Sequence, residues 1–431
     1  MVLRQLRLGF SSRARNLEVV LLGLTGAFVV VGWRSLDAAG FQMSETSSRA
    51  MTQFLMTMLL GHMALRFVAP RASAATYATV GMLSAIGLVF TVRLAPEVAQ
   101  DQANWITLGV GGMVVTAGCH RLFPRLQRMK YSAAFFAAIV LAGTGLFGTT
   151  INGARLWITI SGRTVQTTEI IKALLVVFLA GYLTDVGAVL ASTGFRFGGR
   201  RYSNWPYLIP LVVTWLGAMA ALALLKDLGT IALLLMLAIA SLYVATGRLR
   251  FVAGGLALLG ATAVAGYVAF GHVQDRIDTW RDPYATADSS GYQTVQGIYA
   301  IQAGGITGEG LGLGEPTVIP AVTTDYVFAA IAEELGLAGA AGVVLLFGVL
   351  VVGGLQVALA TRDPFLRLLA CCSALLLGIQ AAVIIAGNLR LIPTTGITLP
   401  FVSYGGSSLV INFALIGLIL GVSEESSSER S

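Results

Sequence analysis

YVFAAIAEELGLAGAAGVVLLFGVLVVGGLQVAL, from Tyr326 to Leu359, is an apolar run too long for one straight helix across a membrane. A membrane-spanning helix needs roughly 20 apolar residues. Two adjacent carboxylates, Glu333 and Glu334, interrupt the run near its start, and Asp325 lies just before it. A charged side chain inside a membrane helix costs about 3 kcal/mol on insertion scales. We therefore expect the run to begin as a short tilted or re-entrant helix.

The composition of the whole chain indicates a polytopic membrane protein. Of its 431 residues, 56% are hydrophobic and only 11% are charged, whereas a soluble domain has roughly 25% charged residues. The mean hydropathy is +0.80. The net charge of +7 follows the ends of the apolar segments, so it indicates orientation and attraction to anionic lipid headgroups rather than nucleic-acid binding. No soluble domain is predicted at either end.

Twelve apolar segments have the length of a membrane helix, and the fold class is therefore all-α. Strands are not expected in them, since the segments lack period-2 alternation and exceed the length of barrel strands. The twelve candidates are 17–33, 50–68, 75–92, 103–119, 132–151, 168–190, 207–225, 229–246, 251–271, 326–359, 364–386 and 407–421.

The positions of Lys and Arg predict that both termini lie in the cytoplasm, because basic residues gather in cytoplasmic loops. The segment 272–324 is then an outer loop, by far the longest. We divide the chain into an N-terminal membrane region, 1–130, a core, 131–421, and a cytoplasmic tail, 422–431. Long loops are functional or disordered, and the aromatic and Gly-rich composition of this one favours an ordered, functional loop.

Charged residues of the predicted outer side form a candidate site for an anionic headgroup, with Arg155, Glu169, Lys172 and Lys226 as its members. The milder alternatives stay open. Glu169 and Lys172 are three residues apart on one helix face and can pair with each other. Lys226 and Asp227 can extend to the membrane interface, where Trp157 also belongs by its residue type.

Asp325 allows two interpretations from local sequence. With Thr323 and Thr324 it can stabilise a helix start, or it can act as a general base at the water-exposed mouth of a cavity and take a proton from a sugar hydroxyl. On a continuous helix, Glu333 and Glu334 would lie roughly 12–14 Å deeper than Asp325. They would be too deep to act on the same atom and would instead organise the helix inside the bundle.

Other motifs exclude several classes of site. Ser403, Tyr404, Gly405, Gly406 and Ser407 form a turn followed by a helix start, but no Lys-Ser/Thr follows as in a phosphate-binding loop. The three histidines are scattered, so no metal site is predicted. Three cysteines give no disulfide framework. We expect no cofactor, and the sequence does not indicate whether a divalent cation is required.

Four motifs and the loop between them, taken in order, resemble the SEDS family of membrane glycosyltransferases. The resemblance covers roughly residues 130–421. The motifs are NGARLW at 152–157, QTTEIIK at 166–172, TDYVFA with EELG between 324 and 336, and LPFVSYGGSS at 399–408, with GYQTVQGIYAIQAGGITGEGLG at 291–312 as the loop.

This resemblance implies a ten-helix core, preceded here by an extra N-terminal pair, in the cytoplasmic membrane of a bacterium. It implies an enzyme that polymerises lipid II into peptidoglycan glycan strands at the outer face of the membrane, with a class B penicillin-binding protein as partner. Asp325 would be the essential carboxylate, and Trp157, Glu169, Lys172 and Asp227 match functionally important positions. The twelve spans favour the RodA type and a role in cell elongation.

Departures from the family pattern keep alternatives open. Thr167 stands where the family has Pro, and Pro320 to Thr323 differ from the usual segment before the aspartate. The alternatives are a flippase for the lipid-linked precursor, a non-catalytic scaffold for a cell-wall synthase, and a division role of the FtsW type. Polar groups concentrated at one side of the membrane favour chemistry there over transport through the full depth.

Overall fold

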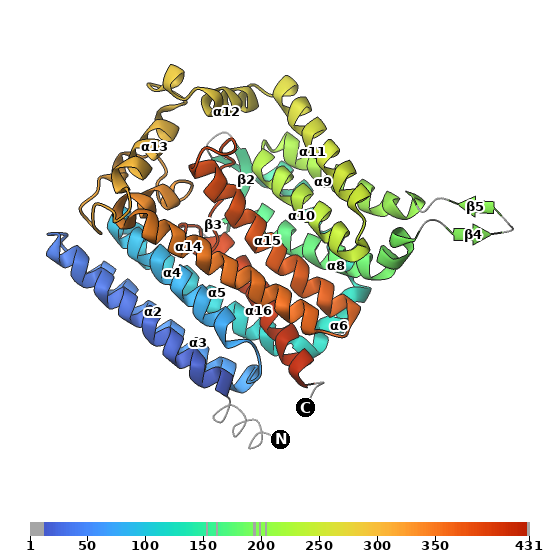
Figure 1. Cartoon of the computed structure of the whole chain (residues 1–431), viewed down its shortest axis with the longest axis horizontal. Coiled ribbons are helices and arrows are strands. Elements are labelled where there is room, and N and C mark those ends of the chain that lie inside the picture. Colours follow the sequence, from blue (N-terminus) through green and yellow to red (C-terminus); the bar gives the residue numbers. More distant parts are fainter. Residues whose placement is uncertain are drawn as a thin grey trace.

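The computed structural model describes residues 13–151, 154–160, 163–192, 195–197, 200–202 and 205–428. The basic residues 1–12, the last residues 429–431 and Asn152–Gly153 of the first motif lie outside this part. All twelve predicted spans overlap helices, which lie side by side as a bundle (Figure 1), but residues 149–151 at the end of the fifth predicted span form a strand. The all-α fold class predicted from hydropathy is confirmed.

The helices of the bundle are α2 (Arg13–Ala38), α3 (Glu45–Val68), α4 (Ala74–Leu94), α5 (Ala99–Gly118), α7 (Lys130–Phe147), α8 (Thr167–Ala191), α9 (Ile209–Leu224), α10 (Leu228–Thr246), α11 (Leu249–Ala269), α14 (Val327–Ala360), α15 (Pro364–Asn388) and α16 (Gly406–Ser428). Shorter helices connect them: α6 (Phe123–Arg128), α12 (Gly271–Arg281) and α13 (Tyr292–Gly304).

Ten helices of the described residues are long and apolar enough to cross a membrane, and α5, bent by 56° into α6, makes an eleventh. The remaining predicted span, α3, has the length but carries Gln53, His62 and Arg66. The protein is a multi-pass membrane protein.

Two small antiparallel sheets lie outside the helices and were not predicted. In the first, β1 (Thr149–Ile151), β2 (Ala154–Ile160) and β3 (Arg163–Gln166) form a meander that leads directly into α8. Its register pairs Trp157 with Gln166. The second joins β4 (Phe195–Phe197) and β5 (Arg200–Tyr202). The three-residue strands β1, β4 and β5 give little alternation to detect, and ARLWITI of β2 does not alternate strictly between apolar and polar residues, so the sequence pattern did not reveal the sheets.

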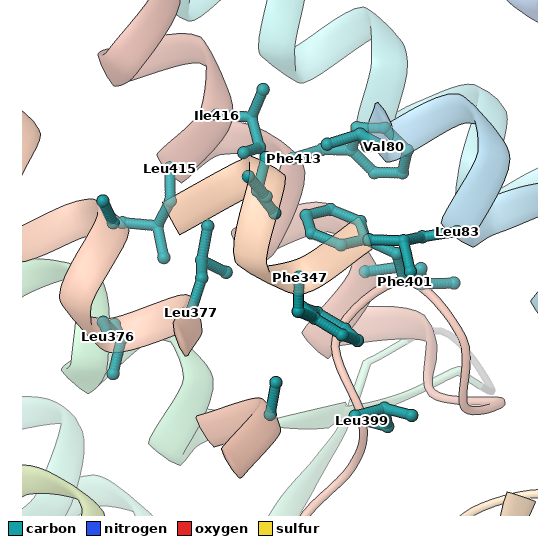
Figure 2. Close-up of a cluster of buried hydrophobic side chains, with 14 of the residues drawn as sticks. Val80, Leu83, Phe347, Leu376, Leu377, Leu399, Phe401, Phe413, Leu415 and Ile416 are labelled. Carbon is teal, nitrogen blue, oxygen red and sulfur yellow. The ribbon is translucent and has the colours of Figure 1, made fainter. Parts of the chain in front are cut away.

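The core reaches into the loop before α16 (Figure 2). Phe401 packs edge-on against Phe413 of α16, with 5.2 Å between ring centroids, and both are buried with Leu83 of α4. Gly87 of α4 lies so close to this loop that a Cβ there would be 2.5 Å from the Val402 carbonyl oxygen. The loop is therefore fixed against the bundle, and the Ser-Tyr-Gly-Gly-Ser motif that follows starts from a rigid support.

The long run that opened the sequence is broken, as predicted. Gly336 has φ 64° and ψ −166° inside α14, which is non-helical. Both glutamates are buried and have partners on other segments. Glu334 pairs with Arg93 at the end of α4, with 3.0 Å between Nε and Oε1, and Glu333 accepts from the Glu315 amide at 2.7 Å. The break follows both glutamates, whose carbonyls accept from the Glu309 and Gly310 amides, so the first part of α14 lies against the 305–315 loop.

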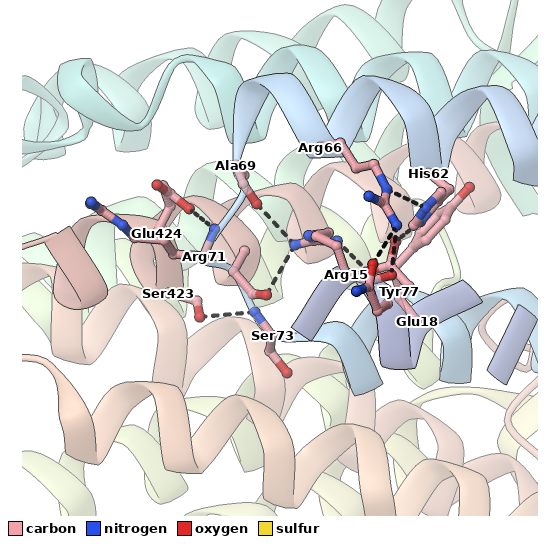
Figure 3. A network of polar contacts seen from close by, with 12 residues as sticks. Arg15, Glu18, His62, Arg66, Ala69, Arg71, Ser73, Tyr77, Ser423 and Glu424 are labelled. Carbon is pink, nitrogen blue, oxygen red and sulfur yellow. Dashed lines mark hydrogen bonds and ion pairs between the residues drawn. The ribbon is translucent and has the colours of Figure 1, made fainter. Parts of the chain in front are cut away.

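The N-terminal pair is fastened to the core by buried polar groups (Figure 3). Arg15 of α2 donates to the Ala69 and Ala72 carbonyls and pairs with Glu18. Glu18 also contacts His62 of α3 at 2.6 Å. These groups therefore join α2 to α3 and to the loop that enters α4.

The loop between α3 and α4 also holds the far end of the chain. The Arg71 amide donates to Glu424 at 2.6 Å and the Ser73 amide to Ser423 at 3.1 Å, both on α16. This explains why α16 continues past the predicted end of the last span at residue 421 as far as Ser428: its last turns make these contacts.

Candidate functional site

Two cavities meet at Asp325. The larger cavity, about 490 Å³, is lined by residues of α5, β2, β3 and the loops before α10, α14 and α16. The smaller cavity, about 200 Å³, lies between α12, α13, α15 and the loop at 394–397. Asp325, Arg276, Thr395 and Gly396 line both. A group transferred between ligands in the two cavities would pass this carboxylate.

Gly396 lets two charged side chains approach each other across the junction. A Cβ at Gly396 would be 3.3 Å from the Arg276 guanidinium and 3.8 Å from Oδ2 of Asp325. Its φ of +69° is in the region that favours glycine. Arg276 is held by the Thr395 carbonyl at 3.1 Å. The guanidinium thus lies near the carboxylate, on the other side of Gly396.

The backbone around Asp325 is fixed from two sides. Tyr404 donates its amide to the Thr323 carbonyl at 2.8 Å, and the Ser403 hydroxyl donates to the Thr324 carbonyl. On the other side, the Asn388 amide group donates to the Asp325 carbonyl at 2.8 Å and accepts from the Ala329 amide at 3.2 Å. Asn388 therefore caps the start of α14, where no cap by a preceding side chain is found. The Asp325 carboxylate is left available to the cavities.

Burial raises the pKa of the Asp325 carboxyl above its ordinary value. The Thr324 hydroxyl and the positive charge of Arg276 oppose this rise. A carboxyl whose pKa is raised is a stronger base when ionised, and this is the property that general-base catalysis uses near neutral pH.

Three of the predicted substrate-binding residues line the larger cavity: Trp157, Lys226 and Asp227. Trp157 is placed by the pairing of β2 with β3. Asp227 caps α10 by accepting from the Thr230 amide at 3.0 Å, while its buried Oδ2 has no hydrogen-bond partner in the described part of the chain. The raised pKa of Asp227 has burial as its main cause. The larger cavity thus holds the cation of Lys226, the carboxyl group of Asp227 and the indole of Trp157.

The Ser-Tyr-Gly-Gly-Ser motif also lines the larger cavity from Tyr404 to Ser407. Ser407 accepts from the Gln166 amide at 3.0 Å, which joins this motif to the end of β3. Gly406 lies against the Trp105 indole, at 2.2 Å from a Cβ built on it. The second and fourth sequence motifs, 241 residues apart at this contact, therefore form one wall.

The other predicted residues lie elsewhere. Glu169 and Lys172 form a buried ion pair at 2.7 Å, and Lys172 also donates to Gln380 at 2.9 Å. Neither lines a cavity. Gln380 donates in turn to the Thr398 carbonyl at 2.8 Å. Since Thr398 lines the larger cavity, the ion pair supports the wall of that cavity through Gln380. Arg155 donates to the Gly145 carbonyl at 2.9 Å and is exposed.

Several cavity residues were not identified from the sequence. Arg276 is one of several charged residues in a long loop, with no motif around it. Asp101, Asn104 and Trp105 lie on α5, before the region that carries the resemblance. Asn388 caps α14 through a contact across 59 residues, which local sequence does not indicate.

Fold and site define a polytopic membrane protein with a carboxylate at the junction of two cavities. The family model of the FtsW, RodA and SpoVE proteins, described as cell cycle proteins, matches residues 74–428. The chain belongs to this family, as its motifs predicted.

Two relatives named as glycosyltransferases match most of the chain. It is 33% identical over 429 residues to the peptidoglycan glycosyltransferase RodA of Mycobacterium leprae, with 95% of this chain and 90% of the relative covered. It is 35% identical over 332 residues to the probable peptidoglycan glycosyltransferase FtsW of Alcanivorax borkumensis, covering 74% and 81%.

A solved structure confirms the fold. A chain from a peptidoglycan synthase complex that coordinates polymerization and crosslinking superimposes with a TM-score of 0.69 at 27% identity. It covers 82% of this chain and 98% of that chain. Nearly all of the solved chain thus has a counterpart here, while part of this chain lies outside it.

Proposed function

We propose that this protein is a peptidoglycan glycosyltransferase of the RodA type that polymerises lipid II. The observation that carries the proposal is the position of Asp325 at the junction of two cavities, since polymerisation joins two sugar-bearing lipids at one point. The names of the relatives support the same activity.

In the proposed reaction, Asp325 takes the proton from the 4-hydroxyl of the acceptor sugar. The resulting oxygen attacks the anomeric carbon of the donor sugar, and the bond from that carbon to pyrophosphate breaks. Undecaprenyl pyrophosphate leaves with the bonding electrons. One base is sufficient because pyrophosphate leaves readily once its negative charge is balanced.

Two cations are placed to balance that charge. Lys226 and Arg276 both line the larger cavity, and charge-assisted hydrogen bonds to phosphate oxygens are among the stronger ones in proteins. The sequence also suggested Arg155 and Lys172 as cations for this site. Neither lines the larger cavity, so each would act on the substrate only indirectly, through the residues of the cavity wall.

The lipid tail of the substrate needs an apolar path. A groove of about 530 Å³ lies between α7, α8 and α9, lined by small and apolar side chains such as Ala134 and Gly217. It ends at Leu225, next to Lys226 of the larger cavity. A polyprenyl chain in this groove would leave its pyrophosphate close to the cation.

The orientation and the partner are parts of the same proposal. We expect the cavities and the 272–324 loop to face away from the cytoplasm and both termini to lie inside, in the cytoplasmic membrane of a bacterium. A class B penicillin-binding protein would supply the crosslinking activity, as the similarity to a chain of a synthase complex suggests.

The proposal is tested by supplying lipid II to the purified protein, with and without a cognate transpeptidase, and separating the products on gels. We expect a ladder of glycan strands. Translocation of labelled precursor in liposomes without any polymer would instead identify a carrier, and neither activity with a bound transpeptidase would identify a scaffold.

Activity should fall as the pH is lowered through the raised pKa of Asp325, because a protonated carboxyl cannot accept the hydroxyl proton. Arg276→Gln removes a positive charge that favours the ionised form. The acid limb of kcat/KM should therefore move to higher pH in this variant. Arg281→Gln, an exposed residue on the same helix outside both cavities, is the control and should keep the wild-type limb. A limb that moves to lower pH would contradict the assignment of Asp325.

A further inference from the structure

A strip of amide and hydroxyl groups joins α3 to α5 inside the membrane region. Gln53 of α3 donates to Asn104 Oδ1 at 3.1 Å and to Thr107 at 3.0 Å, and its Oε1 accepts from Gln100 at 2.6 Å. Thr57 and Thr107 are 2.9 Å apart. Polar groups in a membrane helix are unfavourable unless partnered, and their presence marks a candidate functional site.

The strip fixes the orientation of the Asn104 amide. Its Oδ1 accepts from both Gln53 and Gln100, the latter at 3.3 Å. With Gln53 and Gln100 in the orientations found here, an inverted Asn104 would place its NH₂ group against these two NH₂ groups. In this orientation, Asn104 Nδ2 makes no hydrogen bond to any group in the described ranges. Unlike the buried atoms that lack a partner, it is accessible to a ligand.

Asn104 lines the larger cavity together with its neighbour Trp105. Its amide therefore connects two regions: the oxygen is held by α3, and the residue forms part of the wall facing the reaction site. The cavity already holds Lys226 and Asp325. A free NH₂ donor in such a wall suits an oxygen-rich ligand.

The supporting side chain lies before the part of the chain that the family model matches. Gln53 precedes residue 74, where the family model begins. The α3 helix packs along α5, and the polar network around Arg15, Glu18 and His62 fastens it at the far end. The N-terminal pair is therefore held rigidly enough to position a side chain of the core.

We propose that Gln53 is a positioning residue that orients Asn104 to donate a hydrogen bond to an oxygen of the lipid-linked substrate in the larger cavity. This inference rests on the proposed glycosyltransferase function. The oxygen belongs either to the pyrophosphate or to a sugar hydroxyl, since both accept from an amide. The N-terminal pair is then a working part of the site.

Asn104→Ala removes the donor and should raise KM for lipid II about tenfold with little change in kcat, the size of one hydrogen bond to a charged or polar ligand group. Gln53→Leu leaves the amide unoriented and should raise KM severalfold. In the Asn104→Ala background, Gln53→Leu should add nothing, because Gln53 acts through Asn104. Independent, multiplying effects would contradict the positioning role.

Asn104→Asp distinguishes the two oxygen sources. A carboxylate beside pyrophosphate repels it, so KM should rise more than in Asn104→Ala. Beside a sugar hydroxyl, a carboxylate can accept a hydrogen bond, and KM should then rise less than in Asn104→Ala. Either order supports a substrate contact at Asn104.

Thr107→Val is the matched control, since it removes another partner of Gln53 outside the cavity and should keep the wild-type KM. Melting temperatures of all variants, measured in the same detergent, identify any that fail to fold. Polymerisation by the wild type with unchanged KM in both Asn104→Ala and Gln53→Leu would overturn this inference alone. No polymer from the wild type would overturn the proposed function, and this inference with it.

Discussion

Asp325→Asn should reduce the rate of glycan polymerisation by about a thousandfold, within the range that a general base contributes. Asparagine has nearly the same shape as aspartate but cannot take a proton from the acceptor hydroxyl. The backbone around the residue is held by Ser403, Tyr404 and Asn388 through main-chain groups. The substitution should therefore leave the fold and the two cavities intact.

The measurement is the initial rate of polymer formation from lipid II, at saturating substrate, with the melting temperature recorded for each variant. Asp278→Asn is the control: it lies on α12, is exposed and lines neither cavity, so its rate should match the wild type. Near-normal polymer from a folded Asp325→Asn protein would refute the base assignment and leave the carboxylate without a role in the reaction.

Gly336→Ala should destabilise the protein by about 5 kcal/mol, the sum of a strained backbone and an overpacked contact. The φ of 64° with ψ of −166° is a conformation that only glycine adopts readily. An added Cβ would lie 2.4 Å from the Gly308 nitrogen and 2.5 Å from the Ile306 carbonyl oxygen. Both are backbone atoms, which cannot move aside as a flexible side chain can.

Gly342→Ala in the same helix is the matched control. Its Cβ would meet nothing within 4 Å, and its backbone is helical. Alanine there should be neutral or slightly stabilising, since it is a better helix former than glycine. Thermal unfolding in detergent and the yield of monodisperse protein give the comparison. Equal melting temperatures for the two variants would mean that α14 is not broken at Gly336.

Much of the fold could be predicted from hydropathy, because each membrane helix must be apolar by itself. The break in the long run was also predictable, since its length exceeds one crossing. Where the first half of α14 points could not be predicted. That direction depends on Arg93 and the Glu315 amide, which are 241 and 18 residues from their glutamate partners, and a single sequence contains no signal for such pairs.

The candidate site was predictable only where a motif marks it. Trp157 and Asp227 were marked by resemblance and Lys226 by its charge, and all three lie in the larger cavity with Asp325. Glu169 and Lys172 were grouped with them because charged residues on one side of a membrane look alike in sequence. The milder alternative, a mutual ion pair, describes their contact. Which face of a helix meets water or protein is decided by packing, and hydropathy averages over that difference.

The contact between the Arg71 amide and Glu424 on α16 sets an order of events during synthesis. Its partners are 353 residues apart. At translation rates of about 5–20 residues per second, roughly 20–70 s separate their emergence from the ribosome. During that interval the N-terminal pair is already in the membrane while the helix that completes its attachment is unmade. The attachment of the loop after α3 to α16 is thus among the last contacts of the bundle to form.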